Sequence, residues 1–281
     1  MLVSLRELLP EAARADYAVP CFNVFGYEDA RAVVSAAEKF GRPVIIAANK
    51  TLVEFMGIEN AASMLSLLAK EASVPVCTHL DHTYEESVVY QGIHYGFSSV
   101  MFDGSQLALE ENIRRTRQVV EVAHACGVSV EGEIGSVPYD DIRPHIKTIT
   151  TSPDDAVRFA HESGVDAVAV SVGNIHRLKE PTATIDHNQL EKIAAKVDTP
   201  LVIHGTSGIR EHDLLRLRKG PVAKFNIGTI LRMAFGYKLQ EVVRNNPEQF
   251  DRLFLMEAVM PTVEEVTLDQ LKLFYGVDIA H

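Results

Sequence analysis

The chain has 281 residues, of which 47% are hydrophobic and 23% charged, so it can bury a large core and is not intrinsically disordered. Its net charge is −11 and its basic residues form no dense run, which argues against nucleic acid or an anionic membrane as a partner. The three cysteines have no C-x-x-C spacing, and neither a signal peptide nor a long apolar span is evident, so we expect a cytoplasmic protein.

Short apolar runs bounded by turn residues are predicted to be strands, and most are continuous, as in strands buried on both faces. In chain order they are 19–25, 43–48, 74–81, 98–103, 128–134, 167–173, 200–205 and 223–228. Stretches with an apolar stripe at helical spacing occupy 28–40, 59–72, 84–95, 107–126, 153–163, 187–197, 210–219 and 229–245. This alternation predicts an α/β fold, a (β/α)8 TIM barrel forming a single domain over 1–281. A tail at 246–281, with one more helix at 262–275, follows the barrel.

Polar side chains that bind ligands stand at the carboxyl ends of the predicted strands, where barrels of this kind carry their chemistry. They are Asn23, Asn49, Asp81, His82, Asp103, Glu133, His176, His204 and Asn226. His82, His176 and His204 end the third, sixth and seventh strands, and three neutral imidazoles at one mouth suit Zn²⁺ with an open position for substrate. Asp103 and Glu133 could form a second metal position or fix the histidine tautomers. A single histidine is more often structural, and the other eight are interpreted in that way.

Two glycine-containing segments follow the last two strands, "HGTSGI" (204–209) and "NIGT" (226–229). Loops at these places commonly bind phosphate through backbone N–H groups. Gly205, Ser207 and Gly208 allow close approach of the backbone, and Thr229 begins a helix whose N-terminus favours an anion. We therefore expect a phosphorylated small molecule as ligand.

The chain resembles the class II, zinc-dependent ketose-bisphosphate aldolases over nearly its whole length, most clearly over 1–240. The matching pieces are "FNVF" (22–25), "HLDH" (79–82), "GFSSVMFDGS" (96–105), "GVSVEGEIG" (127–135), "LVIHGTSGI" (201–209) and "KFNIGT" (224–229). The resemblance implies that His82, His176 and His204 bind zinc and that Asp81 is the catalytic acid/base. It also implies that Asp103 and Glu133 hold a second divalent or a monovalent cation, and that family members assemble as homodimers or homotetramers.

By the same resemblance, Asn23 contacts the substrate and two loops bind dihydroxyacetone phosphate. The residues of these loops are Gly205, Thr206, Ser207, Asn226, Ile227, Gly228 and Thr229. The implied activity is that of a lyase of carbohydrate metabolism, such as glycolysis. It would cleave a ketose 1-phosphate or 1,6-bisphosphate of the fructose or tagatose type to dihydroxyacetone phosphate and an aldehyde such as glyceraldehyde 3-phosphate.

Three departures from the family pattern concern the substrate. A Gly-Gly-x-Glu loop, whose glutamate moves a proton, is replaced by "SVPYDD", which offers only Asp140 and Asp141. The usual glycine after the second zinc histidine is Arg177, which could reach a phosphate or be an ordinary loop arginine. The usual serine after the second strand is Asn49, followed by Lys50, so an altered and anionic aldehyde half is an alternative.

Other functions remain open at this stage. A metal-dependent hydrolase on the same barrel explains the histidines but not the two phosphate loops. A Schiff-base aldolase needs a desolvated lysine, and Lys50 and Lys224 are the isolated candidates. A degenerate, non-enzymatic barrel would account for the altered loop but not for Asp81 and the histidines together.

Overall fold

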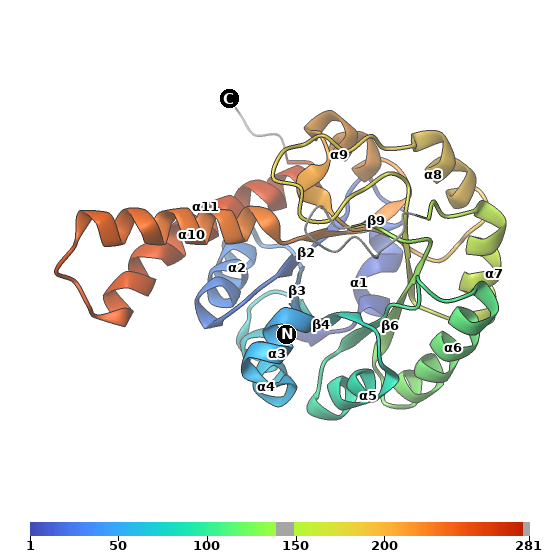
Figure 1. Ribbon diagram of the computed structural model, residues 1–281, viewed down its shortest axis with the longest axis horizontal. Helices are drawn as coiled ribbons and strands as arrows, with labels where there is room; N and C mark the ends of the chain where they lie inside the picture. The colour runs from blue at the N-terminus through green and yellow to red at the C-terminus, as the bar shows by residue number, and fades with distance from the viewer. Residues whose placement is uncertain (139–148, 278–281) are drawn as a thin grey trace.

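The computed structural model describes residues 1–138 and 149–277. Eight parallel strands close into a barrel, because β2 pairs with β9 and β4 pairs with β5 (Figure 1). The strands are β2 Val19–Asn23, β3 Val44–Asn49, β4 Val76–Thr83, β5 Ser99–Phe102, β6 Ser129–Ile134, β7 Ala167–Val170, β8 Leu201–Ile203 and β9 Val222–Ile227. The predicted TIM barrel is confirmed, and each predicted strand is found within a few residues of its expected bounds.

Helices surround the barrel between successive strands, as the apolar stripes predict. They are α2 Tyr27–Phe40, α4 Ile58–Glu71, α5 Glu86–Tyr95, α6 Leu109–Ala125, α7 Pro153–Ser163, α8 His187–Ala194, α9 Glu211–Arg218 and α10 Thr229–Asn245. Local signals set their ends. For α7 the Ser152 side chain accepts a hydrogen bond from the Asp155 N–H, and Gly164 ends the helix in the left-handed region.

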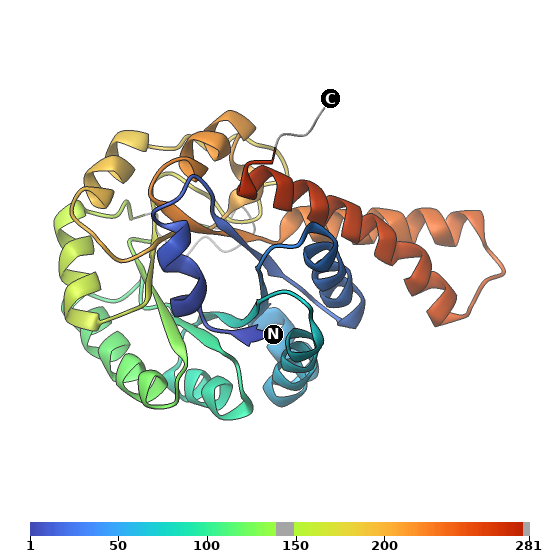
Figure 2. The same ribbon diagram turned by 180° about the vertical axis from the view of Figure 1, so that it is seen from behind.

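The amino-terminal segment closes one mouth of the barrel, which the sequence analysis did not predict. Strand β1 (Leu2–Val3) pairs with the beginning of β4, and helix α1 (Leu5–Ala12) follows it. Leu5, Leu8, Leu9 and Ala12 are buried against inward side chains of the strands, including Val19, Ile45, Cys77, Met101 and Val202. Figures 1 and 2 show α1 inside the ring of helices. The opposite mouth, at the carboxyl ends of the strands, therefore holds the functional cavity.

The carboxyl-terminal helix is longer than expected. Helix α11 spans Arg252–Tyr275 rather than 262–275, and Asp251 caps its first turn. Its end packs on the barrel, where Phe274 stacks on Phe225 with ring centroids 4.6 Å apart. Helix α10 and the beginning of α11 project from the barrel as a hairpin (Figures 1 and 2). The pattern at 262–275 marked only the part of the helix nearer its carboxyl end.

A short helix not expected from the sequence, α3 (Lys50–Met56), follows β3 directly. Among the described residues no single helix could cross a membrane; α3 and α4 reach the required length and composition only as a pair, bent by 108° at their junction.

Candidate active site

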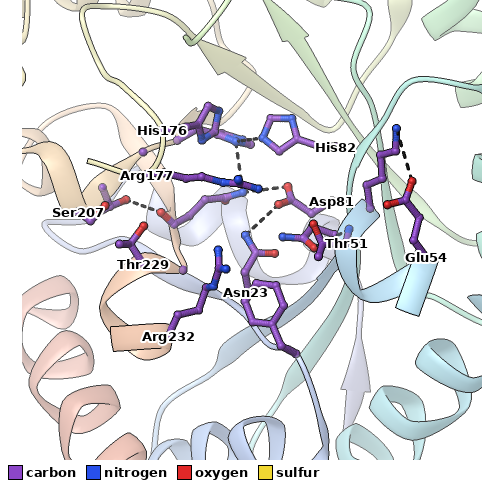
Figure 3. A pocket seen from close by; sticks show the side chains of 18 of the residues that line it. Asn23, Thr51, Glu54, Asp81, His82, His176, Arg177, Ser207, Thr229 and Arg232 are labelled. Atoms are coloured by element: carbon purple, nitrogen blue, oxygen red, sulfur yellow. Dashed lines mark hydrogen bonds and ion pairs between the residues drawn. The ribbon is translucent and has the colours of Figure 1, made fainter. Parts of the chain in front are cut away.

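A cavity of about 420 Å³ opens at the carboxyl ends of the strands (Figure 3). Most of the predicted site residues line it: Asn23, Asn49, Lys50, Asp81, His82, His176, Arg177, His204, Gly205, Thr206, Ser207, Asn226, Gly228 and Thr229. In Figure 3, Ser207, Thr229 and Arg232 lie on one side, Thr51 and Glu54 on the other, and Asp81, His82 and His176 lie between them. The structure thus brings the histidines, the acid and both glycine-containing loops to one cavity, whereas Asp140 and Asp141 lie outside the described residues.

The end of β4 presents two neighbouring residues to the same cavity. Side chains normally alternate along a strand, so Asp81 and His82 should point to opposite sides. The pairing of β4 with β5 is irregular between Leu80 and Thr83, and His82 has a φ of 48° in the left-handed region. Such a bulge re-aims a side chain. It costs backbone strain of about 1–3 kcal/mol, of a kind that collects at functional sites.

Carboxylates hold two of the three histidines in a defined orientation. Nδ1 of His82 lies 2.9 Å from Oδ2 of Asp103, and Nε2 of His204 lies 2.9 Å from Oε1 of Glu131. When these nitrogens donate, the remaining lone pairs are on Nε2 of His82 and Nδ1 of His204, which face each other at 2.9 Å. Two facing lone pairs repel unless a cation binds both. Tetrahedral Zn²⁺ bonds of about 2.0–2.1 Å separate two nitrogens by roughly 3.4 Å, so a small widening accommodates the ion. The donor set therefore fits a metal.

The third imidazole comes from a loop rather than from a strand end. Strand β7 stops at Val170, and His176 follows in the loop, where its backbone N–H donates to the Pro138 carbonyl. The ligand atoms of His82, His176 and His204 all lie within 4.8 Å of one another. Burial, and then the neighbouring His82, hold the pKa values of His176 and His204 well below the ordinary range. Both rings are therefore neutral at neutral pH, which is the form that binds a metal.

A second group of possible metal ligands shares His82. Asp103, Glu133 and His82 also have ligand atoms within 4.8 Å of one another, and all three are buried. Burial by itself would raise the pKa of Asp103, but its hydrogen bonds with His82 and Ser105 lower it to about 2. For Glu133, burial and then Asp103 raise the pKa well above the ordinary value, and Oε2 has no hydrogen-bond partner among the described residues. Both predicted carboxylates thus lie beside His82.

Asp81 is held by two amides. Nδ2 of Asn23 and Nδ2 of Asn226 each donate to one of its carboxylate oxygens at 3.0 Å. Burial alone would raise the pKa of Asp81, but His82, His204 and Lys224 lower it below its ordinary value. The result is an ionised, oriented carboxylate beside the imidazoles, suited to accept a proton from a bound hydroxyl group.

The two glycine-containing loops form one wall of the cavity. Gly205 has a φ of 71°, and a Cβ atom there would lie 2.3 Å from the Ile175 carbonyl oxygen, so only glycine fits. The Thr206 hydroxyl donates to the Asn226 carbonyl at 2.6 Å, which ties the two loops together. Helix α10 begins beside them at Thr229. Ile227, a predicted site residue, is a buried core residue and is not among the residues that line this cavity.

The opposite wall combines the predicted residues Asn49 and Lys50 with residues that the sequence analysis did not single out. Asn49 ends β3 and caps α3, accepting hydrogen bonds from the Thr51 and Leu52 N–H groups. Nζ of Lys50 lies 3.7 Å from Oε1 of Glu54, and both side chains are largely exposed. Thr51, Glu54, Tyr84, Phe25 and Arg232 also line the cavity, and of these Arg232 lies on the side of Ser207 and Thr229 (Figure 3). Arg232 was detectable in principle, because it stands one helical turn after Thr229.

The fold and the site together define a TIM-barrel enzyme whose side chains can hold a metal ion. Residues 3–278 match the model of the class II fructose-bisphosphate aldolase family, and the chain belongs to this family. It is therefore an aldolase, a lyase that cleaves carbon–carbon bonds, from a family that is generally metal-dependent and acts on sugar phosphates.

Solved structures of two aldolases resemble the chain over almost its full length. The YdjI aldolase from Escherichia coli K12 is 32% identical, with a TM-score of 0.84 over 98% of this chain and 97% of that one. A fructose-bisphosphate aldolase from Campylobacter jejuni is 24% identical, with a TM-score of 0.81 over 98% of this chain and 95% of that one. At that lower identity the second comparison supports the fold alone.

Proposed function

We propose that the protein catalyses the zinc-dependent, reversible aldol cleavage of a ketose 1-phosphate or 1,6-bisphosphate to dihydroxyacetone phosphate and an aldehyde. The observation that carries this proposal is the pair of imidazole nitrogens, on His82 and His204, that face each other at 2.9 Å with carboxylates behind both rings. Nitrogen-rich sites with an open position suit zinc better than magnesium or calcium, which prefer oxygen ligands. The residues that would hold the ion are His82, His176 and His204, with Asp103 and Glu133 available to a second or displaced cation.

Retro-aldol cleavage breaks the C3–C4 bond and leaves negative charge on the three-carbon fragment. A divalent ion supplies Lewis-acid stabilisation of that charge, worth several kcal/mol. Asp81 takes the proton from the C4 hydroxyl, since its carboxylate is ionised and is oriented by Asn23 and Asn226. Backbone N–H groups of 205–207 and 227–229 bind the phosphate of this fragment, and the N-terminus of α10 favours its charge.

A second proton carrier must protonate the three-carbon fragment after cleavage. We assign this role to Asp140 or Asp141, because they are the carboxylates of the segment that replaces the glutamate loop of the family. Single Asp140→Asn and Asp141→Asn variants distinguish them. The variant that lacks the carrier should accumulate the deprotonated fragment, which an added oxidant such as ferricyanide traps at an undiminished rate.

The aldehyde half would occupy the wall formed by Lys50, Thr51, Glu54 and Tyr84. Lys50 offers a cation to an anionic tail, while Glu54, 3.7 Å away, accepts hydrogen bonds from hydroxyl groups. This mixed lining supports a polar aldehyde. Both phosphorylated and non-phosphorylated aldehydes therefore belong in the assay, together with uronate-type aldehydes that carry a carboxylate.

The direct test is to incubate zinc-loaded protein with dihydroxyacetone phosphate and an aldehyde panel and to read product masses. The expected result is a ketose 1-phosphate lengthened by the aldehyde, abolished by chelation and restored by zinc. Asp81→Asn protein is the matched control, because it retains the histidines. Release of inorganic phosphate without a new carbon–carbon bond would favour the hydrolase alternative, and activity that survives chelation would exclude the proposal.

We further infer that a second copy of the chain covers the hairpin of α10 and α11, giving a homodimer or homotetramer. Phe250 and Leu253 near its tip are 93% and 69% exposed, and Val243 and Phe254 are exposed beside them. Apolar side chains gathered on one projecting element are typical of protein interfaces. Sedimentation velocity should show an oligomer, which Phe250→Glu together with Leu253→Glu should weaken.

A cytoplasmic location agrees with three free cysteines and can be checked by cell fractionation.

A further inference from the structure

A fully buried lysine lies beneath the cavity and has no part in the mechanism described above. Lys224 stands on β9, two residues before Asn226, and its side chain is 0% exposed. Its Nζ lies 2.7 Å from Oε2 of Glu131 and donates to Oδ1 of Asn226 at 2.5 Å. The sequence interpretation of Lys224 as isolated is therefore wrong, because its partner Glu131 lies on β6, across the barrel interior.

The first contact of Lys224 leads to a metal ligand. Glu131 uses Oε2 for Lys224 and Oε1 for Nε2 of His204. A carboxylate that accepts from one nitrogen of an imidazole fixes the tautomer and directs the other nitrogen toward the metal. Lys224 fixes Glu131 in position through this ion pair. Nδ1 of His204 thereby keeps its lone pair toward the cavity.

The second contact leads to the proton-accepting carboxylate. Asn226 has an amide whose two ends are nearly identical in shape, so sterics alone do not determine which end faces Asp81. The ammonium of Lys224 can only donate, so it selects the oxygen, Oδ1. Nδ2 must then point at Asp81, where it donates at 3.0 Å. Without Lys224 the amide can turn and place its oxygen against the Asp81 carboxylate, which repels it.

The environment of Lys224 excludes the Schiff-base role that the sequence left open. That role needs a neutral amine in contact with the substrate. Burial alone would lower the pKa of Lys224, but the acidic groups around it, Cys21, Glu131 and Asp81, raise it above the ordinary value. Lys224 also does not line the cavity. A buried ion pair is in general weak evidence for stability, because apolar residues of equal volume often stabilise at least as well. An orienting role accounts better for this charge.

We propose that Lys224 is a positioning residue that orients the metal ligand His204 through Glu131 and the carboxylate Asp81 through Asn226. One ammonium group would thus set both halves of the site, the metal position and the proton acceptor. This inference rests on the proposed function, because it assumes that these two groups act on a single substrate.

The test compares Lys224→Met, which keeps the volume and removes the charge, with wild-type protein. Metal affinity is measured by competition with a chromophoric chelator, and the ligand geometry by the visible absorption of the cobalt-substituted protein. We expect metal affinity to fall by about 10–100-fold, as for other partners of ligating histidines. We also expect altered cobalt bands and a lower kcat at little-changed KM. Thr267→Val is the control, because it removes a buried hydrogen bond to Val263 in α11, remote from the cavity. This control should lower Tm and leave metal affinity, the cobalt bands and kcat unchanged.

A double variant keeps the proposal testable if Lys224→Met does not fold, because Glu131→Gln combined with Lys224→Met leaves no unpaired buried charge. We expect this variant to recover Tm while metal affinity and kcat stay low, since neither His204 nor Asn226 is oriented. Recovery of both affinity and kcat would overturn the proposal and reduce Lys224 to a counter-ion. Unchanged affinity and kcat in folded Lys224→Met would also overturn it. Wild-type protein that binds metal but forms no carbon–carbon bond would refute the proposed function and leave the metal-affinity result valid.

Discussion

The two halves of the barrel interior are equally buried but differ in kind. Toward the amino ends of the strands, Leu5 and Leu9 of α1 pack on Cys77 and Met101, all at 0% exposure. The polar half comprises Asp81 on β4, Glu131 on β6, His204 directly after β8 and Lys224 on β9, with 0% or 1% exposure. Burial alone therefore does not define a core. The apolar half gains free energy from every residue, whereas the polar half must offset desolvation by ion pairs and hydrogen bonds. We expect stability and chemistry to divide between the two halves. Three substitutions test that division, and two more test the exposed residues Lys50 and Glu54.

The largest effect is expected for His204→Ala in the polar half. The variant should lose its bound metal, and kcat/KM should fall by roughly 10³-fold or more, since Lewis-acid stabilisation is worth several kcal/mol. Elemental analysis of the purified protein and an aldol-cleavage assay measure the two losses. Full metal content with full activity would show that the imidazoles do not form the reactive centre.

Next in size is Asp81→Asn, which removes the proposed proton acceptor and keeps its shape. We expect kcat to fall by about 10²–10⁴-fold, the usual contribution of a positioned acid or base. Metal content should be unchanged, since Asp81 is not among the imidazole ligands. If the metal is lost as well, Asp81 also helps to hold the cation and the two roles are not separable.

For the apolar half we choose Leu9→Ala, which opens a cavity between α1 and the strands. The expected loss is about 2–5 kcal/mol of the free energy of unfolding, with kcat/KM per folded molecule unchanged. Chemical denaturation monitored by circular dichroism measures it. Leu67→Ala is the control, because Leu67 is 57% exposed and should cost under about 0.5 kcal/mol. A strong loss of activity in folded Leu9→Ala would refute the proposed division.

The smallest effect is expected for Lys50 and Glu54, the largely exposed residues that line the cavity. Lys50→Ala should raise KM for an anionic aldehyde by no more than about fivefold, because an exposed ion pair contributes about 0.2–1 kcal/mol. Glu54→Gln, which removes the opposite charge 3.7 Å away, should lower the same KM. Steady-state kinetics with charged and neutral aldehydes check both. Equal responses to the two aldehydes would remove Lys50 from substrate recognition.

Sequence patterns predicted the barrel well, because continuous apolar runs and apolar stripes reflect burial directly. The sequence patterns failed where contacts between distant segments determine the position or length of an element. Helix α1 includes Pro10, a residue that usually interrupts helices, and it lies inside the amino-terminal mouth. An eight-residue pattern predicts neither the helix nor its position. The hairpin of α10 and α11 was missed in part, since the exposed apolar residues at its tip obscure the stripe of a packed helix.

At the site, residue type and position at strand ends were enough to bring His82 and His204 together. Three features were not predictable. The irregularity after Leu80 lets Asp81 and His82 share one cavity, the loop carries His176 inward from beyond β7, and Lys224 meets Glu131 across the barrel. Each depends on backbone geometry or on contacts between distant segments, and single-sequence periodicity contains no record of either.

Because α1 fills the far end of the barrel, we expect substrate, products and ion to exchange through the same entrance. A ligand bound in the cavity should then block the path by which the metal ion leaves. Zinc would be stripped by a chelator much more slowly from the ligand-saturated protein than from the empty one, and the rate of stripping would report occupancy.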